Sequence, residues 1–484
     1  MTSNKWLRLK ISLVFGLLFS IVAEVQAGAV ITIINGNAAG VGFNDTTPAA
    51  PVGGNPGTTL GEQRLFAFTY AANIWGATLT SAVPIQILAT FEPLTCTATS
   101  ATLGSAGATS VFVDFPGAIK PGTLYSAALA SKLFGEDITI DPDTAPTGTA
   151  HIRARFNSNL GLNANCLPGS PFYLGIDNNH GALIDFPTVL LHEMGHGIGF
   201  QTFTNGATGA QLAGFPSIWD FYLLDNVSNK LWVDMTPQER VASAISNNGL
   251  SWNGANVTAQ APVVLSKASN LAISGPSAGS ASGNYQVGDA SFGAPLSSTS
   301  VAGQLMPVVD QPDLINGLAC TPLSAANALA VRGNIALVTR GVCGFVVKAK
   351  NVQDAGAIGM IVSDNVLAPI SGLGGTDPTV VIPSVRITLT DGNTLRSHLT
   401  TRSRTKSGVI ANLGLHPTAL SGSDRLGRVL MNTPNPYQPG SSVSHYTPAT
   451  QRNQLMEPAI NGDLTHLPTL PVDLTFELLK DIGW

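Results

Sequence analysis

The sequence predicts an α+β protein in which a smaller α/β module interrupts a larger unit. In the first 200 residues a helical pattern is followed by strand-like runs and then by a second helix, so this part of the chain mixes α and β elements. Strands and helices alternate between about residues 330 and 400, which indicates a compact α/β module. After Gly414 the pattern is irregular and rich in turns, and it ends in one further helix.

Composition excludes several classes of protein. Charged residues are 11% and apolar residues 44% of the chain, which rules out a charge-rich coiled coil and a disordered acidic or basic chain. The formal net charge of −5 comes without a concentrated basic face, so we expect no nucleic-acid partner. No pattern indicates an oligomeric state.

The N-terminus predicts export. Basic residues precede a short apolar run at Ile11–Ala23, and small residues occupy Val25 and Ala27. This is the pattern of a signal peptide over residues 1–27, and the run is too short for a stable membrane span of about 20 residues. We therefore expect a secreted, extracellular or periplasmic protein without a stable membrane span.

Four cysteines then lie in a compartment that permits disulfides. Cys96 and Cys166 lie in the N-terminal third, and Cys320 and Cys343 lie close together in the later module. Of the three possible connectivities, pairing within each segment is the simplest.

The first part of the chain predicts two helices. Leu60–Leu79 has apolar residues at helical spacing, and a second helix opens at Asp185 and Pro187 and ends near Gly199. The residues expected on one apolar face of the first helix are Leu65, Phe68, Ala72 and Trp75. The expected strands are Val83–Phe91, Ser110–Phe115, Ala150–Phe156 and Phe172–Ile176.

The rest of the chain predicts an N-terminal lead-in, a boundary region, an alternating module and a last helix. Residues 28–59 predict an extended lead-in, and residues from about 255 to 310 predict a boundary region. The alternating module is expected to consist of strands and helices at Asn334–Thr339, Phe345–Ala357, Ile358–Ser363, Val380–Ile387 and Asp391–Leu399, and the last helix is Asp473–Ile482.

The second helix carries an H-E-x-x-H motif at His192–His196. Histidines four residues apart on a helix project from one face, so both imidazoles can reach one Zn²⁺. Glu193 lies beside that position and can act as the general base on a zinc-activated water.

A catalytic zinc needs a third protein ligand. The contiguous H-E-x-x-H-x-x-G-x-x-H pattern has Gly199 but places Thr202 where the third histidine should be. Three solutions stay open: an acidic residue, a distant histidine, or no ligand at all and hence a dead site. The acidic candidates are Asp220, Asp225 and Glu239, and the histidines are His151, His180, His398, His416, His445 and His466. The context favours His445, because Leu455-Met456-Glu457-Pro458 follows it closely and a methionine turn underlies such sites.

These motifs resemble the leishmanolysin family of metzincin metalloproteases. The resemblance rests on H-E-M-G-H-G-I-G-F, followed much later by S-H-Y and Q-L-M-E-P. It implies a metzincin-type zincin domain, with a twisted sheet, an active-site helix and a smaller C-terminal subdomain. It also implies zinc ligands His192, His196 and His445, Glu193 as general base, and structural roles for the residues Gly199 and Met456. The chain departs from the family at Tyr446, where a tryptophan is usual.

The segment between the second and third histidines resembles the protease-associated (PA) domain. Gly333–Phe345, Lys348–Asn351, Ala355–Ala357 and Val381–Val385 carry this resemblance. It implies a non-catalytic α/β module inserted into the protease. The expected organisation is a signal peptide at 1–27, catalytic parts at 28–257 and 413–484, and the inserted PA domain at 258–412.

The motifs together predict a secreted zinc endopeptidase that acts on proteins or peptides. The metzincin resemblance further implies that the strand Ala150–Phe156 is the sheet edge that pairs with an extended substrate. Two other classes stay open. A zinc hydrolase of a non-protein amide would share the ligands, and an exported binding or adhesion protein would keep a vestigial site.

Overall fold

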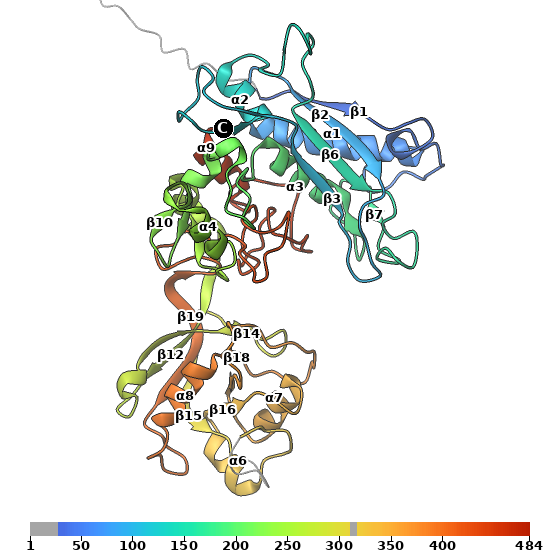
Figure 1. Cartoon of the computed structure of the whole chain (residues 1–484). Helices are drawn as coiled ribbons and strands as arrows, with labels where there is room; N and C mark the ends of the chain where they lie inside the picture. The colour runs from blue at the N-terminus through green and yellow to red at the C-terminus, as the bar shows by residue number, and fades with distance from the viewer. Residues whose placement is uncertain (1–27, 310–316) are drawn as a thin grey trace, which may run out of the picture.

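The computed structural model describes residues 28–309 and 317–484, and they form two units joined by a pair of long strands (Figure 1). The predicted signal peptide at 1–27 lies outside the described residues. In the part of the chain that the structure describes, no helix has the length and apolar character needed to cross a bilayer.

A four-stranded sheet organises the first unit. Its strands are β1 (Ile31–Asn35), β2 (Ile85–Glu92), β6 (Ile152–Asn157) and β3 (Gly104–Ala108), in the order β1-β2-β6-β3. β1, β2 and β6 are parallel, and β3 pairs antiparallel with β6. The prediction that Ala150–Phe156 forms the sheet edge was therefore wrong, because β3 covers β6 and is itself the edge strand.

Two helices pack against this sheet. The first, α1 (Leu60–Thr78), starts with a capping box in which Thr59 and Glu62 bond reciprocally. Of the four residues expected on one apolar face, Phe68, Ala72 and Trp75 are buried, whereas Leu65 is 39% exposed. The second, α3 (Phe186–Ile198), is buried along its whole length.

Shorter elements complete the first unit. In its N-terminal part they are β4 (Val111–Phe112), β5 (Tyr125–Ser126), α2 (Ala127–Phe134), β7 (Phe172–Tyr173) and β8 (Ile184–Asp185). Beyond α3 they are β9 (Leu223–Asp225), β10 (Lys230–Leu231), α4 (Pro237–Ser243), β11 (Leu250–Trp252), α5 (Ala255–Val264) and the last helix α9 (Thr475–Ile482). Short 3-10 turns, among them η3 (Ile218–Phe221), lie between them.

The second unit is built on an eight-stranded sheet of order β13-β12-β19-β15-β16-β17-β18-β14. β15 to β18 are parallel neighbours, as the alternation of strands and helices predicts. The strands are β12 (Lys267–Ser274), β13 (Gly283–Gln286), β14 (Gly288–Asp289), β15 (Val301–Pro307), β16 (Ile335–Thr339), β17 (Gly359–Ser363), β18 (Ser384–Ile387) and β19 (Ile410–Leu420). The helices are α6 (Ala325–Val331), α7 (Phe345–Asp354) and α8 (Leu389–Ser397).

The second unit begins and ends on the antiparallel strands β12 and β19. Val257, Ala261 and Val264 of α5 are buried in the core of the first unit, as is Leu420 at the end of β19. The boundaries expected at 257/258 and 412/413 thus fall inside α5 and inside β19. The long paired strands run from one unit to the other (Figure 1).

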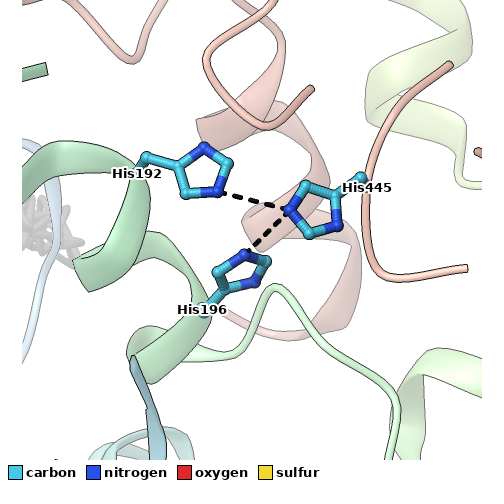
Figure 2. A group of neighbouring side chains, drawn as sticks. All are labelled: His192, His196 and His445. Carbon is cyan, nitrogen blue, oxygen red and sulfur yellow. Dashed lines mark hydrogen bonds between the residues drawn. The ribbon is translucent and has the colours of Figure 1, made fainter. Parts of the chain in front are cut away.

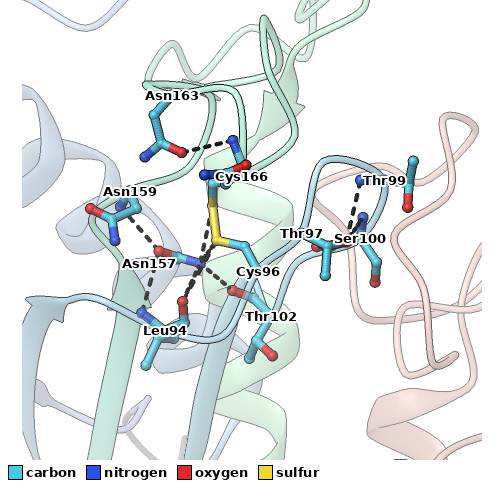
Figure 3. Close-up of a disulfide and its surroundings, with 11 residues drawn as sticks. Leu94, Cys96, Thr97, Thr99, Ser100, Thr102, Asn157, Asn159, Asn163 and Cys166 are labelled. Atoms are coloured by element: carbon cyan, nitrogen blue, oxygen red, sulfur yellow. Dashed lines mark hydrogen bonds between the residues drawn. A yellow bond between two sulfur atoms is a disulfide. The ribbon is translucent and has the colours of Figure 1, made fainter.

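Both disulfides pair as the sequence predicted. Cys320 bonds Cys343 in the second unit, and Cys96 bonds Cys166 in the first. Figure 3 shows the Cys96–Cys166 bond beside Asn157, whose side chain donates to the Thr102 carbonyl at 2.9 Å. The disulfide and Asn157 therefore anchor the loop that leads into the edge strand β3.

Candidate metal centre

The helix α3 carries the H-E-x-x-H motif in a fixed frame. Its N-cap is Asp185, whose carboxylate accepts the Thr188 amide, and Pro187 occupies the first turn. Gly199 ends the helix at φ 147°, a backbone conformation that side chains rarely adopt. The Phe200 carbonyl then turns back and accepts from His196 Nδ1 at 2.8 Å.

Three histidines converge on one point. His196 Nε2 lies 3.2 Å from His445 Nε2, which lies 3.3 Å from His192 Nε2 (Figure 2). Two of the rings come from α3 and the third from the loop after β19. All three side chains are buried, and they are the only group of three or more potential ligand residues found among the described residues.

Each ring is oriented by a backbone carbonyl. Leu455, Phe200 and Ser441 supply these carbonyls, which lie 2.7–2.8 Å from the Nδ1 atoms of His192, His196 and His445 respectively. If each Nδ1–H donates to its carbonyl, each Nε2 is left with a lone pair directed at the common centre.

The rings are held neutral by burial. Desolvation lowers the pKa of His192 to about 4 and that of His196 to about 3, and it lowers the pKa of His445 well below its usual value. Three neutral Nε2 lone pairs facing one another repel unless a cation lies between them. Two ligands at 2.0–2.1 Å from a tetrahedral Zn²⁺ are about 3.3–3.4 Å apart, which matches the observed spacing. The residues therefore fit a zinc ion.

Glu193 lies between the histidines and the edge strand. Burial raises the pKa of Glu193 to about 8, although a hydrogen bond from the Ala106 backbone opposes the rise. A Cβ atom placed on Gly104 would lie 2.8 Å from Glu193 Cγ, so the glycine leaves the room that the carboxylate occupies. A cation at the histidines would lower the pKa of Glu193, because an opposite charge favours the ionised form.

Met456 lies against the middle of the H-E-x-x-H motif. Its Sδ would be 2.8 Å from a Cβ placed on Gly195 in the middle of the motif. The turn that carries Met456 is bonded to two sides of the site. The Leu455 carbonyl pairs with His192 Nδ1, and the Met456 carbonyl accepts the amide of Tyr446.

The acidic alternatives for the third ligand have other partners. Asp220 accepts hydrogen bonds from neighbouring hydroxyl groups, Asp225 caps the β9–β10 turn, and Glu239 completes the capping box of α4. The other histidines also bond elsewhere. His151 contacts Ser131, His180 the Leu183 carbonyl, His398 Ser280, His416 the Thr418 amide, and His466 Asp185. Only His445 joins His192 and His196.

The sequence did not reveal the pair Asp185–His466. His466 Nε2 lies 2.8 Å from Asp185 Oδ2, so the segment after Met456 is tied to the start of α3. Burial alone would raise the pKa of Asp185, but hydrogen bonds from His466 and Thr188 outweigh it and lower the pKa. No spacing rule connects residues so far apart in the chain, so no local signal could have found them.

Comparison with known proteins identifies one domain. Residues 301–395 match the PA domain family, so the second unit contains a PA domain, as predicted. A curated relative, ER degradation-enhancing alpha-mannosidase-like protein 3 of Xenopus laevis, is 36% identical over 115 residues, which are 22% of this chain and 12% of that protein. Minor extracellular protease Vpr of Bacillus subtilis (strain 168) is 40% identical over 67 residues, which are 14% and 8% of the two chains.

The matched stretches are short. The chain spans only about a tenth of the length of these two relatives, 12% and 8%. Among solved structures, an aminopeptidase from Aneurinibacillus sp. strain AM-1 is similar over 32% of each chain, with 21% sequence identity and a TM-score of 0.24.

Proposed function

We propose that this chain is an exported zinc-dependent endopeptidase of the metzincin type. The observation that carries the proposal is the convergence of three buried imidazoles, with Glu193 next to His192 on the same helix. His192, His196 and His445 would hold the zinc, which when bound lowers the pKa of a water and polarises a carbonyl. Two disulfides and the predicted signal peptide support export.

Glu193 supplies the acid–base chemistry. Its carboxylate takes a proton from the attacking water and delivers it to the nitrogen of the departing amine. The closed surroundings support this role. The Ala106 backbone holds the carboxylate, and Gly104 lets the strand approach it closely.

The position of β3 at the edge of its sheet favours a peptide as the substrate. β3 is the last strand of its sheet, so among residues 28–309 and 317–484 no strand pairs with one side of its backbone, and it runs past Glu193. An extended peptide can add to such an edge through main-chain hydrogen bonds. Its residues Gly104–Ala108 are all glycine, alanine or serine, which keeps the approach to the backbone open. A substrate laid along β3 extends in both directions, which favours an endopeptidase.

Substitution of the general base tests this function. We expect Glu193→Gln to keep its zinc and lose activity on casein by about 10²- to 10⁴-fold, the usual contribution of acid–base catalysis. Glu239→Gln is the matched control, because Glu239 is a capping carboxylate at the start of α4. A Glu193→Gln variant that digests casein like the wild type would refute the mechanism. A zinc-loaded wild type that cleaves small amides but no peptide would instead indicate a non-protein substrate.

A further inference from the structure

Asp220 is a fully buried carboxylate outside the group of three histidines. It lies in η3, and its two oxygens accept four hydrogen bonds. Oδ1 accepts from Thr202 Oγ1 at 2.7 Å and from Ser217 Oγ at 2.9 Å. Oδ2 accepts from the Ser217 amide at 3.1 Å and also from Thr204 Oγ1. The carboxylate is therefore satisfied by donors on both the chain that leaves α3 and its own turn.

Thr202 connects this carboxylate to the third histidine. While its hydroxyl donates to Asp220, its backbone amide donates to Ser444 Oγ at 3.2 Å. Ser444 directly precedes His445. Residue 202 is also the position where an uninterrupted motif would carry the third histidine. Thr202, where the chain leaves the site, therefore contacts Ser444, where the chain returns to it after the PA domain.

The same 3-10 turn also supports the site through aromatic rings. Trp219 lies next to Asp220, and its ring contacts Phe200 at 4.8 Å between centroids. Phe200 in turn contacts the ring of Tyr446 at 5.1 Å, and its carbonyl accepts from His196 Nδ1. The turn therefore contacts Phe200, which in turn contacts Tyr446, the residue after His445.

We infer that Asp220 is a positioning residue, which acts through Thr202 and Ser444 to hold His445 in register with the two histidines of α3. This inference rests on the proposed function of the three histidines. An insertion as long as the PA domain leaves the third ligand without a short covalent connection to the helix. Asp220 supplies a non-covalent connection in its place.

Asp225 provides a matched comparison. It is similarly buried and accepts from the Val227 and Ser228 amides and the Ser228 hydroxyl, but these partners only close the turn between β9 and β10. Removal of the Asp220 carboxylate leaves buried donors of Thr204 and Ser217 without an acceptor, whereas the donors to Asp225 lie on exposed residues. Asp225→Ala therefore controls for the loss of a buried carboxylate as such. Only Asp220 has a chain of hydrogen bonds that leads to His445.

The test measures the metal site directly in the full-length protein. Zinc dissociation constants are measured by chelator competition for the wild type, Asp220→Ala, Asp225→Ala and Thr202→Val. The visible spectrum of the cobalt-substituted protein reports ligand geometry. We expect Asp220→Ala and Thr202→Val to weaken zinc binding about tenfold and to change the cobalt spectrum, since outer-shell partners of metal ligands have effects of this size. Asp225→Ala should bind zinc like the wild type.

The variants separate a positioning role of Asp220 from a general loss of folding. Thr202→Val removes one hydroxyl at nearly constant shape, so it carries the test even where Asp220→Ala does not fold. Asp220→Asn should restore most of the zinc affinity, because its amide can donate to hydroxyl groups that are free to accept. Zinc constants and spectra in Asp220→Ala and Thr202→Val equal to those of Asp225→Ala would overturn the inference and leave the proposed function intact. A wild type that binds no zinc would refute the proposed function itself.

Discussion

The contact between Gly104 and Glu193 gives a prediction that separates acid–base chemistry from metal binding. In Gly104→Ala, the new Cβ would lie 2.8 Å from Glu193 Cγ and 2.9 Å from its Oε1. Ordinary van der Waals contact begins near 3.4 Å, so the side chain or the strand must move by about 0.6 Å. Misplacement of a catalytic group by 1 Å can cost about 10²-fold in rate. We therefore expect kcat/KM to fall about tenfold, a barrier increase of about 1.4 kcal/mol.

The histidines should be unaffected by this change, because the added methyl group meets Glu193 and not an imidazole ring. Gly107→Ala is the control on the same strand. Its Cβ would lie 3.4 Å from Gln201 Oε1, an ordinary contact, while the change of residue type is identical.

The assay is cleavage of a fluorogenic peptide, with zinc content measured on the same samples. We expect Gly104→Ala to lose about tenfold in kcat/KM at full zinc content while Gly107→Ala keeps wild-type activity. Equal activity of the two variants, or loss of zinc from Gly104→Ala, would contradict this expectation.

Three further predictions concern the frame of the site. Gly199→Ala forces a side chain into φ 147° where α3 ends, so we expect a loss of about 1–3 kcal/mol in stability, seen as a lower Tm with the Phe200–His196 bond weakened. Reduction of Cys96–Cys166, whose cysteines are 70 residues apart, should destabilise the first unit by about 4 kcal/mol on the chain-entropy model; an unchanged Tm in dithiothreitol would contradict this. Asp185 has a lowered pKa when folded, so its contribution to stability is complete above about pH 4 and is lost as the pH falls through the folded value. Zinc-free Asp185→Asn should therefore lose less Tm than the zinc-free wild type between pH 6 and pH 3.

The elements that carry the motif were predictable because their signals are local. The cap at Asp185, Pro187 in the first turn and Gly199 at the end define α3 within a few residues. The spacing of the H-E-x-x-H motif needs only helical geometry. The alternation in the PA domain likewise depends on short apolar runs, which is why β16, α7 and β17 lie close to where they were expected.

The edge strand was missed for a physical reason. β3 reads Gly-Ser-Ala-Gly-Ala, residues with little preference for strands, and its conformation depends on five residue pairs with β6. β1 lay in a segment interpreted as an extended lead-in, and it is a strand because β2 pairs with it. The boundary region from 255 to 310 contains α5 and strands of the large sheet. In each case the secondary structure depends on pairing or packing with segments distant in the sequence, which local composition does not indicate.

The residues of the candidate site likewise include some that a local motif predicts and some that depend on distant contacts. His192, Glu193 and His196 follow from one motif, whereas the role of His445 rested on a resemblance and on the methionine turn after it. Asp220 and Ser444 have no local signature, because both bond Thr202, which lies 18 residues from Asp220 and 242 residues from Ser444.

The zinc content of His445→Ala tests the central claim most directly, that residues on both sides of the PA domain hold one metal ion. His416→Ala is the matched control, since His416 lies on β19 and bonds the neighbouring Thr418 amide. Elemental analysis of chelator-washed, zinc-reloaded protein should give one zinc per chain for the wild type and His416→Ala, and little or none for His445→Ala. Full zinc content in His445→Ala would contradict the account and assign the third ligand to another residue.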